Sequence, residues 1–169
     1  EKIQLSNDII TSIFPQLEGD KVTFIGSTFL KYGDPEPYKN HCLVVGSCDD
    51  VPGAIIESVP TEKNLLLKWA DLIQTENPDI MIGYNIFGFD YEFMFRRAQE
   101  NKCERNFLLL SRKLNELSAT EDKKTRELNI ENTKMQIASG DYDLRYFKMT
   151  GRLQIDMYAY FRRDFNLSS

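Results

Sequence analysis

The sequence has very little histidine and cysteine, which excludes several kinds of catalytic site. Its 169 residues include one histidine and three cysteines, with no CxxC pair. A single histidine argues against a Ser–His or Cys–His hydrolase. His41 and Cys42 are adjacent, but neighbours on a strand point to opposite faces and no second cluster supplies further zinc ligands. An odd number of unpaired cysteines favours free thiols and a reducing, intracellular setting.

Long apolar runs and net positive charge are also lacking. No apolar stretch approaches the roughly 20 residues that cross a bilayer, so we expect no membrane association. The net charge of −5 is unusual for a free-standing DNA-binding domain. Either DNA is not the ligand, or carboxylates and metal ions form the active part and other domains supply basic surface. Because histidine and cysteine chemistry is disfavoured, any catalysis here must be carried out by carboxylates, and the 26 acidic residues offer many candidates.

The length fits one domain, and the alternation of strand-like and helix-like segments predicts the α/β class. Because the sequence does not begin with Met, we expect it to be a segment of a longer protein. β-Branched and aromatic residues predict strands over 21–30, 41–45, 55–59 and 79–83. Thr61 is a favourable N-cap for a helix that ends at Asn77 and Pro78, with Trp69 on its apolar face.

The second half of the chain is predicted to contain further helices over 90–100, 104–117 and 156–163. The polar stretch 118–132 indicates an exposed loop or a ragged helix, and 140–150 indicates a hairpin.

The stretch from Asn77 to Asp90, NPDIMIGYNIFGFD, carries the most information about chemistry. A predicted strand ends at Gly83, and a tight connection leads to Asp90 at the start of a helix. Asp90 therefore follows the carboxyl end of a strand, where open α/β sheets bind their ligands. Its carboxylate could cap the helix or bind a hard metal ion, and the local pattern leaves both interpretations open.

This string resembles the second exonuclease motif of family B DNA polymerases, including its Pro, Asp, Gly-Tyr-Asn and Phe-Asp positions. Other segments resemble delta-like enzymes in the same order: IFP at 13–15 with Asp20 and Val22, GDPEPY at 33–38, GRLQID at 151–156, and 160–169. The chain thus resembles the central part of a 3′→5′ proofreading exonuclease domain. The polar insert near 118–148 is more similar to polymerases of large DNA viruses than to cellular ones.

The resemblance implies a single RNase H-like (DEDDy) domain over residues 1–169, truncated at both ends. Its mixed sheet would be flanked by helices and would lack the strand of the first motif. Four carboxylates in the complete domain would bind two Mg²⁺ or Mn²⁺ ions and hydrolyse the primer's 3′-terminal nucleotide. The resemblance assigns Asp90 and Glu1 as catalytic metal ligands, and Asn85, Phe89 and Tyr84 as DNA contacts. A turn-forming Asn and a core Phe are the structural alternatives.

Two departures from the family pattern leave the site incomplete. The first motif reads D-x-E, of which Glu1 could supply the Glu. The third motif, Y-x-x-x-D, lies well beyond the GRxQxD segment in this family and is therefore expected past Ser169. Tyr160 and Asp164 have its spacing but belong to the segment that follows GRLQID. We therefore expect the isolated chain to be inactive. Asp156 is expected to be the N-cap of the last helix.

Three functions remain open from the sequence. The first is the proofreading exonuclease of a replicative DNA polymerase, the second is an exonuclease-like module that only positions DNA, and the third is a free-standing exonuclease. GDPEPY and GRLQID argue against the third. The expected partners are a DNA primer–template with a single-stranded 3′ end, the remaining polymerase domains and, by extension, a sliding clamp. The expected location is the nucleus or a viral replication compartment.

Overall fold

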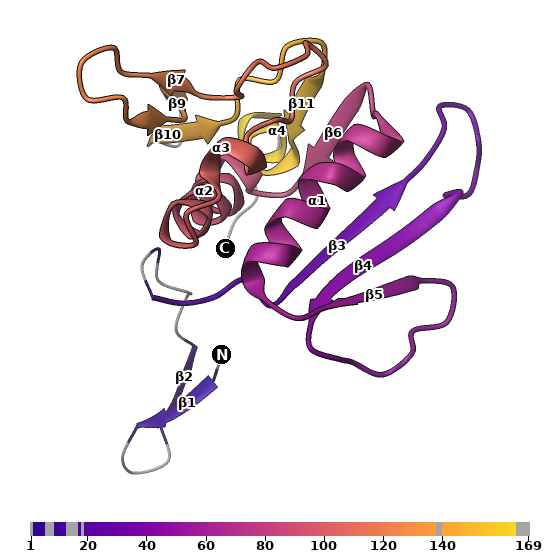
Figure 1. The fold of residues 1–169 in the computed structure, drawn as a ribbon. Helices are drawn as coiled ribbons and strands as arrows, with labels where there is room; N and C mark the ends of the chain where they lie inside the picture. Colours follow the sequence, from indigo (N-terminus) through magenta and orange to yellow (C-terminus); the bar gives the residue numbers. More distant parts are fainter. Residues whose placement is uncertain (1, 6–8, 13–16, 18, 138–139, 165–169) are drawn as a thin grey trace.

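The computed structural model describes residues 2–5, 9–12, 17, 19–137 and 140–164, and its elements alternate as an α/β fold (Figure 1). The strands are β1 Lys2–Leu5, β2 Ile9–Ser12, β3 Phe24–Phe29, β4 Lys39–Val45, β5 Ile55–Val59, β6 Ile80–Gly83, β7 Thr120–Glu121, β8 Leu128–Asn129, β9 Glu131–Ile137, β10 Gly140–Tyr146 and β11 Leu153–Asp156. The helices are α1 Glu62–Glu76, the π-helix η1 Ile86–Asp90, α2 Tyr91–Glu100, α3 Glu104–Phe107 and α4 Met157–Asp164. No helix among these residues is long and apolar enough to cross a membrane.

Two small sheets carry the architecture, and three two-stranded ribbons or bridges complete it. In the first sheet β4 is central, antiparallel to β3 and parallel to β5. The second sheet pairs β6 with β11 in parallel, although the two strands lie far apart in the sequence. The remaining pairs, β1–β2, β7–β8 and β9–β10, are antiparallel. The predicted strands over 21–30, 41–45, 55–59 and 79–83 are confirmed, the first of them shortened to β3.

Helix α1 forms where the sequence predicts it and packs against all three strands of the first sheet. Thr61 is its N-cap, with its hydroxyl accepting a hydrogen bond from the Asn64 amide at 3.2 Å. Asn77 ends it in a left-handed conformation (φ 49°), which a short polar side chain tolerates. On the buried face, Trp69 stacks on Phe107 at a centroid distance of 5.9 Å.

A cluster of packed aromatic side chains joins α1 to the second half of the chain. Phe107 and Phe147 are both fully buried and meet edge-to-face at 5.6 Å. Tyr91, at the start of α2, packs on Phe147 at 4.7 Å. This core therefore fixes α2 relative to α1 and to the segment that leads into β11.

A buried ion pair connects the first turn of α1 to α2. The Glu62 carboxylate accepts hydrogen bonds from Arg97 Nε at 2.7 Å, Arg97 Nη2 at 2.8 Å, Asn101 Nδ2 at 2.8 Å and the Val22 amide at 2.8 Å. Burial alone would raise the pKa of Glu62, but these hydrogen bonds outweigh burial and the pKa is lowered. The four bonds satisfy the carboxylate, as a buried charge requires.

The predicted helix over 104–117 is wrong beyond Phe107. The carbonyls that would accept helical hydrogen bonds are taken by groups from elsewhere: Gln74 Nε2 donates to Leu109 O at 2.6 Å and to Ser111 O at 3.0 Å. Leu108 and Leu110 are fully buried, so the chain leaves the helix to place both side chains in the core.

The boundaries of the predicted hairpin and loop are also wrong. The hairpin pairs β9 with β10, so one of its strands comes from polar sequence that starts inside the predicted loop over 118–132. Two short strands, β7 and β8, also lie in that loop. A two-stranded ribbon buries little on either face, so its sequence need not show the apolar alternation that marks a strand.

We predict that Glu62→Gln lowers the free energy of unfolding at pH 7 by about 3 kcal/mol, because it leaves the Arg97 guanidinium buried without its main counter-charge. Since the folded-state pKa of Glu62 is lowered, the stability it contributes is present above its ordinary pKa of about 4.3 and is lost as pH falls through the folded pKa. The difference between wild type and variant should therefore shrink on acidification. Urea unfolding followed by Trp69 fluorescence measures it, with the exposed Glu36→Gln as control. Equal stabilities at pH 7 would contradict the assignment.

Candidate functional site

The segment after β6 makes two unusual backbone turns before α2 begins. Asn85 adopts a left-handed conformation (φ 61°, ψ 23°), and Ile86–Asp90 then forms the π-helix η1. The Asn85 carbonyl accepts hydrogen bonds from the amides of Gly88 at 3.1 Å and Phe89 at 3.0 Å. π-Helical turns are rare in proteins overall, and those that occur are often at functional sites. The turn redirects the chain from the sheet into α2.

Asp90 does not cap α2. Its backbone is helical (φ −60°, ψ −42°) and its side chain makes no capping hydrogen bond, so the helix-cap interpretation of this residue is wrong. The residue is exposed, so its carboxylate can be reached from outside. Partial burial of the carboxylate and then the negative charge of Asp156 raise the pKa of Asp90, against an opposing hydrogen bond to its own amide. Both effects favour neutralisation of the Asp90 charge, by a proton or a cation.

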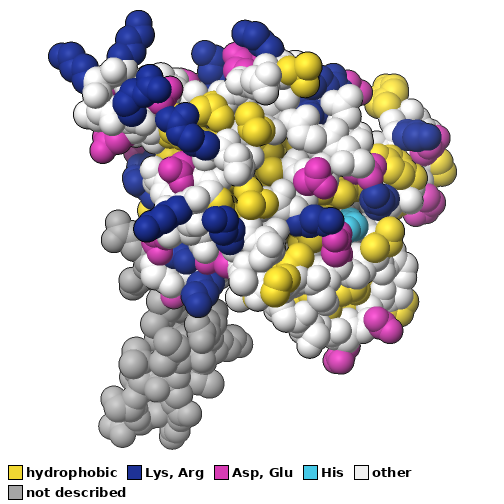
Figure 2. Space-filling model, in the orientation of Figure 1, with side chains coloured by type: hydrophobic (Ala, Val, Ile, Leu, Met, Phe, Trp, Pro, Cys, Tyr) yellow, Lys and Arg dark blue, Asp and Glu magenta, His cyan; other side chains and the backbone are white. Residues whose placement is uncertain are grey.

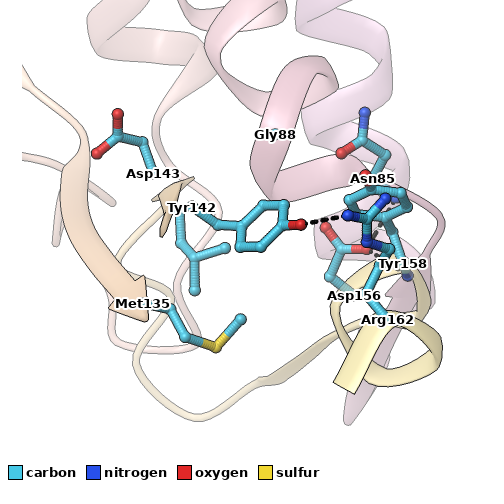
Figure 3. A pocket seen from close by; sticks show the side chains of 9 residues that line it. Asn85, Gly88, Met135, Tyr142, Asp143, Asp156, Tyr158 and Arg162 are labelled. Carbon is cyan, nitrogen blue, oxygen red and sulfur yellow. Dashed lines mark hydrogen bonds between the residues drawn. The ribbon is translucent and has the colours of Figure 1, made fainter. Parts of the chain in front are cut away.

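Asp156 is buried, and its carboxylate reaches the segment after β6 from the end of β11 (Figure 3). Oδ1 accepts hydrogen bonds from the Asn85 amide at 2.8 Å and the Tyr158 amide at 2.9 Å, and Oδ2 accepts one from the Phe87 amide at 2.9 Å. The bond from Tyr158 is the N-cap bond predicted for α4. The other two bonds fix a segment some seventy residues earlier.

At the other end of β11, Arg152 forms hydrogen bonds with the residues that precede β6. Its buried guanidinium donates to Pro78 O at 2.7 Å, Asn77 Oδ1 at 2.9 Å and Leu110 O at 2.9 Å. In register, Leu153 lies opposite Ile80 and Asp156 opposite Gly83. Buried charges at the two ends of β11 therefore hold the residues before and after β6.

Aromatic side chains and one arginine continue from this segment toward the β9–β10 hairpin. Tyr84, 61% exposed, meets Tyr158 edge-to-face at 5.6 Å, and Tyr158 meets Tyr142 at 6.3 Å. The Arg162 guanidinium lies over the rings of Tyr142 and Tyr158 and donates a hydrogen bond to the Tyr142 hydroxyl at 2.6 Å. Figure 3 shows Tyr142, Tyr158 and Arg162 around a small pocket of about 30 Å³, which also borders Asn85 and Asp156. That volume holds a few waters at most.

Basic side chains do not gather into one patch on the face shown in Figure 2, where Lys and Arg are interspersed with Asp and Glu. Several are paired: Arg112 with Asp79 at 2.6 Å, Lys113 with Glu116 at 3.6 Å, and Arg145 with the buried Glu92. The last pair ties the hairpin to α2, two residues after Asp90. This distribution offers no broad electrostatic track for DNA on that face.

Four of the five predicted site residues lie in one continuous segment, 84–90, which is the turn between β6 and α2. Tyr84 and Asn85 lie before η1, and Phe89 and Asp90 lie at its end. Phe89 stacks on Phe93 at 5.2 Å and packs against the core, so it has a structural role whatever else it contacts. Glu1 lies outside the described residues. The DNA contacts and the metal ligation stay predictions.

Within the described part of the chain, no three His, Cys, Asp or Glu side chains lie close enough to hold a metal ion. The donor chemistry of Asp90 suits a hard divalent cation, since its carboxylate is only partly buried and is not used for capping. Asp156 is less suited, because both of its oxygens already accept backbone hydrogen bonds. One available carboxylate fits part of a two-ion site, and further ligands would have to come from other residues.

Sequence reasoning missed the contacts made by Asp156 and Arg152 to the segment around β6. The signal was present, because the charged residues Arg152 and Asp156 stand on either side of a short strand-like stretch, 153–155, in GRLQID. A carboxylate at a strand–helix junction predicts a cap, and local sequence gives no sign of a partner seventy residues away.

A sequence model of the DNA polymerase family B exonuclease domain matches residues 2–169. The chain belongs to this family. It is 44% identical to a DNA polymerase of Phaeocystis pouchetii virus, over 96% of this chain and 16% of the relative. It is 34% identical to a DNA polymerase of Pyramimonas orientalis virus, over 95% of the chain and 13% of the relative. The bovine DNA polymerase delta catalytic subunit is also 34% identical, over 93% of the chain and 13% of that protein.

These comparisons confirm the resemblance to viral and delta-type polymerases. The exonuclease-domain sequence spans about a sixth or less of the length of the relatives it matches. The family match covers nearly the whole chain, including the segment from Asn77 to Asp90 and the GRLQID segment.

We predict that Gly88→Ala displaces the Asn85 side chain, because an added Cβ would overlap Asn85 Oδ1. The backbone of Gly88 does not require a positive φ, so the change should act through this overlap and not through backbone strain. The Asn85 carboxamide resonances in an NMR spectrum should shift. Gly26→Ala is the matched control, since its nearest contact would be an ordinary 3.6 Å. Unshifted Asn85 resonances in Gly88→Ala would show that the turn is looser than described.

Proposed function

We propose that this chain is part of the 3′→5′ proofreading exonuclease of a DNA polymerase, and that it helps to remove the primer's 3′-terminal nucleotide by two-metal hydrolysis. The observation that carries the proposal is the Asp90 carboxylate. It belongs to an exposed residue and makes no capping bond, and it lies after the carboxyl end of β6 in the segment that matches the family. A carboxylate serving only the fold would be expected to cap the helix or form an ion pair.

Each residue of the segment has a role that its position supports. Bound divalent ions would activate a water and stabilise the leaving 3′ oxygen. Asp90 would hold an ion through its carboxylate, and Asn85 would offer its carboxamide to the terminal nucleotide. The exposed ring of Tyr84 is available to stack on a base. Phe89, held against Phe93, would pack beside the primer end.

The complete domain would have an RNase H-like sheet, in which a strand bearing the first motif joins the two sheets seen here. Among the described residues, β6 pairs only with β11 and β3 pairs only with β4, so each has a free edge. Ile80 and Ile82 on β6 are 47% and 63% exposed, although parallel strands are normally covered on both faces. Other parts of a larger protein would cover them. Glu1 would be the Glu of the first motif.

The wider assignment follows from the same resemblance. The substrate would be the single-stranded 3′ end of a DNA primer–template, and the remaining polymerase domains would supply synthesis and basic surface. A sliding clamp would be a further partner. The setting would be DNA replication in the nucleus or in a viral replication compartment.

A module that positions DNA without cutting it is the second candidate. The observation in its favour is that the described residues contain no three-ligand metal group. The available Asp90 carboxylate favours the enzyme, because a positioning module has no need of it. The next experiment separates the two.

In the polymerase that carries this chain, Asp90→Asn should abolish excision of mismatched 3′ nucleotides, because a neutral amide is a far weaker ligand for a hard cation. DNA synthesis should continue. Stability should change by less than about 1 kcal/mol, since no cap is lost. The free energy of unfolding should rise slightly at pH 7, because the pKa of Asp90 is raised in the folded protein. The charged form of Asp90 therefore destabilises the fold at pH values above the folded-state pKa, and this effect is absent below the ordinary pKa of the group. The exposed Asp71→Asn is the control. Normal excision by Asp90→Asn would leave the positioning module as the better candidate.

Excision by the same polymerase should depend on Mg²⁺ or Mn²⁺ and stop when a chelator removes the metal. The 169-residue chain alone should excise little or nothing, because two neighbouring ions need more negative charge than Asp90 and Glu1 supply. Robust metal-independent cutting, or strong activity of the chain alone, would contradict this account of the ligands.

A further inference from the structure

The Asp156 carboxylate does more than an N-cap requires. A cap needs one oxygen to accept one amide of the first helical turn, which here is the Tyr158 amide at 2.9 Å. The same carboxylate accepts two more amides, from Asn85 at 2.8 Å and Phe87 at 2.9 Å. It is 6% exposed, so these bonds form away from bulk water. Ser or Asn would serve as well for the cap alone.

The two extra bonds act where the backbone before Asp90 is hardest to hold. Asn85 is left-handed, and the first amides of η1 have no acceptor within the helix. Left-handed and π-helical turns persist only when their surroundings hold them in place. Asp156 supplies acceptors on both sides of the turn, at Asn85 and at Phe87. The pairing of Asp156 with Gly83 brings the carboxylate to that point.

We propose that Asp156 is a positioning residue for excision: it fixes the Asn85–Phe87 turn and thereby sets where Asn85 and Asp90 present their side chains. This inference rests on the proposed exonuclease function. Asp156 acts through the backbone and does not bind metal itself, because its two oxygens are already used by three amides.

Two substitutions distinguish the two hydrogen bonds to the Asn85 and Phe87 amides, called the brace below, from the N-cap bond to Tyr158. Asp156→Ser keeps a good N-cap but has a single oxygen, so it cannot reach the amides of both Asn85 and Phe87. Asp156→Asn keeps the cap and one acceptor, and replaces the other by a donor that faces an N–H group. Asp122→Asn is the control, because Asp122 Oδ1 also accepts two backbone amides, those of Lys124 and Thr125, but only within its own exposed turn in the β7–β8 connection.

The experiment measures two quantities in the full polymerase. Amide hydrogen exchange of a peptide covering 84–89 reports the brace directly, without reference to activity. Single-turnover excision of a 3′-mismatched primer, against primer concentration, separates the excision rate from DNA affinity. Thermal unfolding and DNA synthesis confirm that each variant is folded.

Both Asp156 variants should speed exchange at Asn85 and Phe87. They should slow excision by about 10- to 100-fold with unchanged primer affinity, the range typical for groups that orient metal ligands. Asp156→Ser should be at least as slow as Asp156→Asn, and Asp122→Asn should match wild type. Wild-type exchange and wild-type excision in folded Asp156→Ser would overturn the inference. Complete loss of excision with exchange unchanged would also overturn it, because Asp156 would then be a metal ligand.

Failure of the inference and failure of the proposed function give different results. If Asp90→Asn still excises normally, the exonuclease function of this site is wrong, whatever Asp156 does to exchange. If Asp90→Asn abolishes excision while both Asp156 variants excise at the wild-type rate, the function stands and the positioning role of Asp156 is wrong.

Discussion

The parallel pairing of β6 with β11 is the constraint on which the site depends. The pairing is only four residues long, and neither strand has a second partner among the described residues. Buried charges compensate for this short ladder: Arg152 binds carbonyls before β6, and Asp156 binds amides after it. Hydrogen bonds to charged groups contribute about 1.5–3 kcal/mol each, more than neutral ones. The register of the functional segment is therefore set by side chains at the strand ends as much as by the ladder itself.

A second set of contacts joins the β9–β10 hairpin to the same segment. Arg145 pairs with the buried Glu92 just after Asp90, and Arg162 holds Tyr142 from α4. Strand β10 of the hairpin also packs against η1. The orientation of the hairpin therefore depends on these polar contacts together with the packing of β10. The site is consequently a junction of four segments, β6, η1, β10 and α4.

The predictions that the structure confirms are those with strong local sequence signals. Helix α1 was correct at both ends because Thr61 and Asn77 have cap preferences that do not depend on tertiary contacts. The strand at β6 and the turn after it followed from apolar sequence bounded by Asn and Gly. The errors arose where distant groups decide the backbone, as at Leu109 and Ser111, whose carbonyls bind Gln74 instead of helical amides. Asp90 is the instructive case, since its sequence context suits both a cap and a ligand, and only the structure shows the carboxylate without a cap bond.

The separation between Asp156 and Asn85 along the chain also fixes the order in which the protein can assemble during synthesis. When β6 leaves the ribosome, the acceptors for the Asn85 and Phe87 amides have not yet been made. At about 5–20 residues per second, the missing stretch takes several seconds to arrive. Until then the turn has no tertiary brace, and its closing contact must also meet the entropy of a long loop. The first sheet and α1, whose partners are close in sequence, can form without waiting for β11. We therefore expect the functional segment to be among the last parts of this chain to acquire its native backbone.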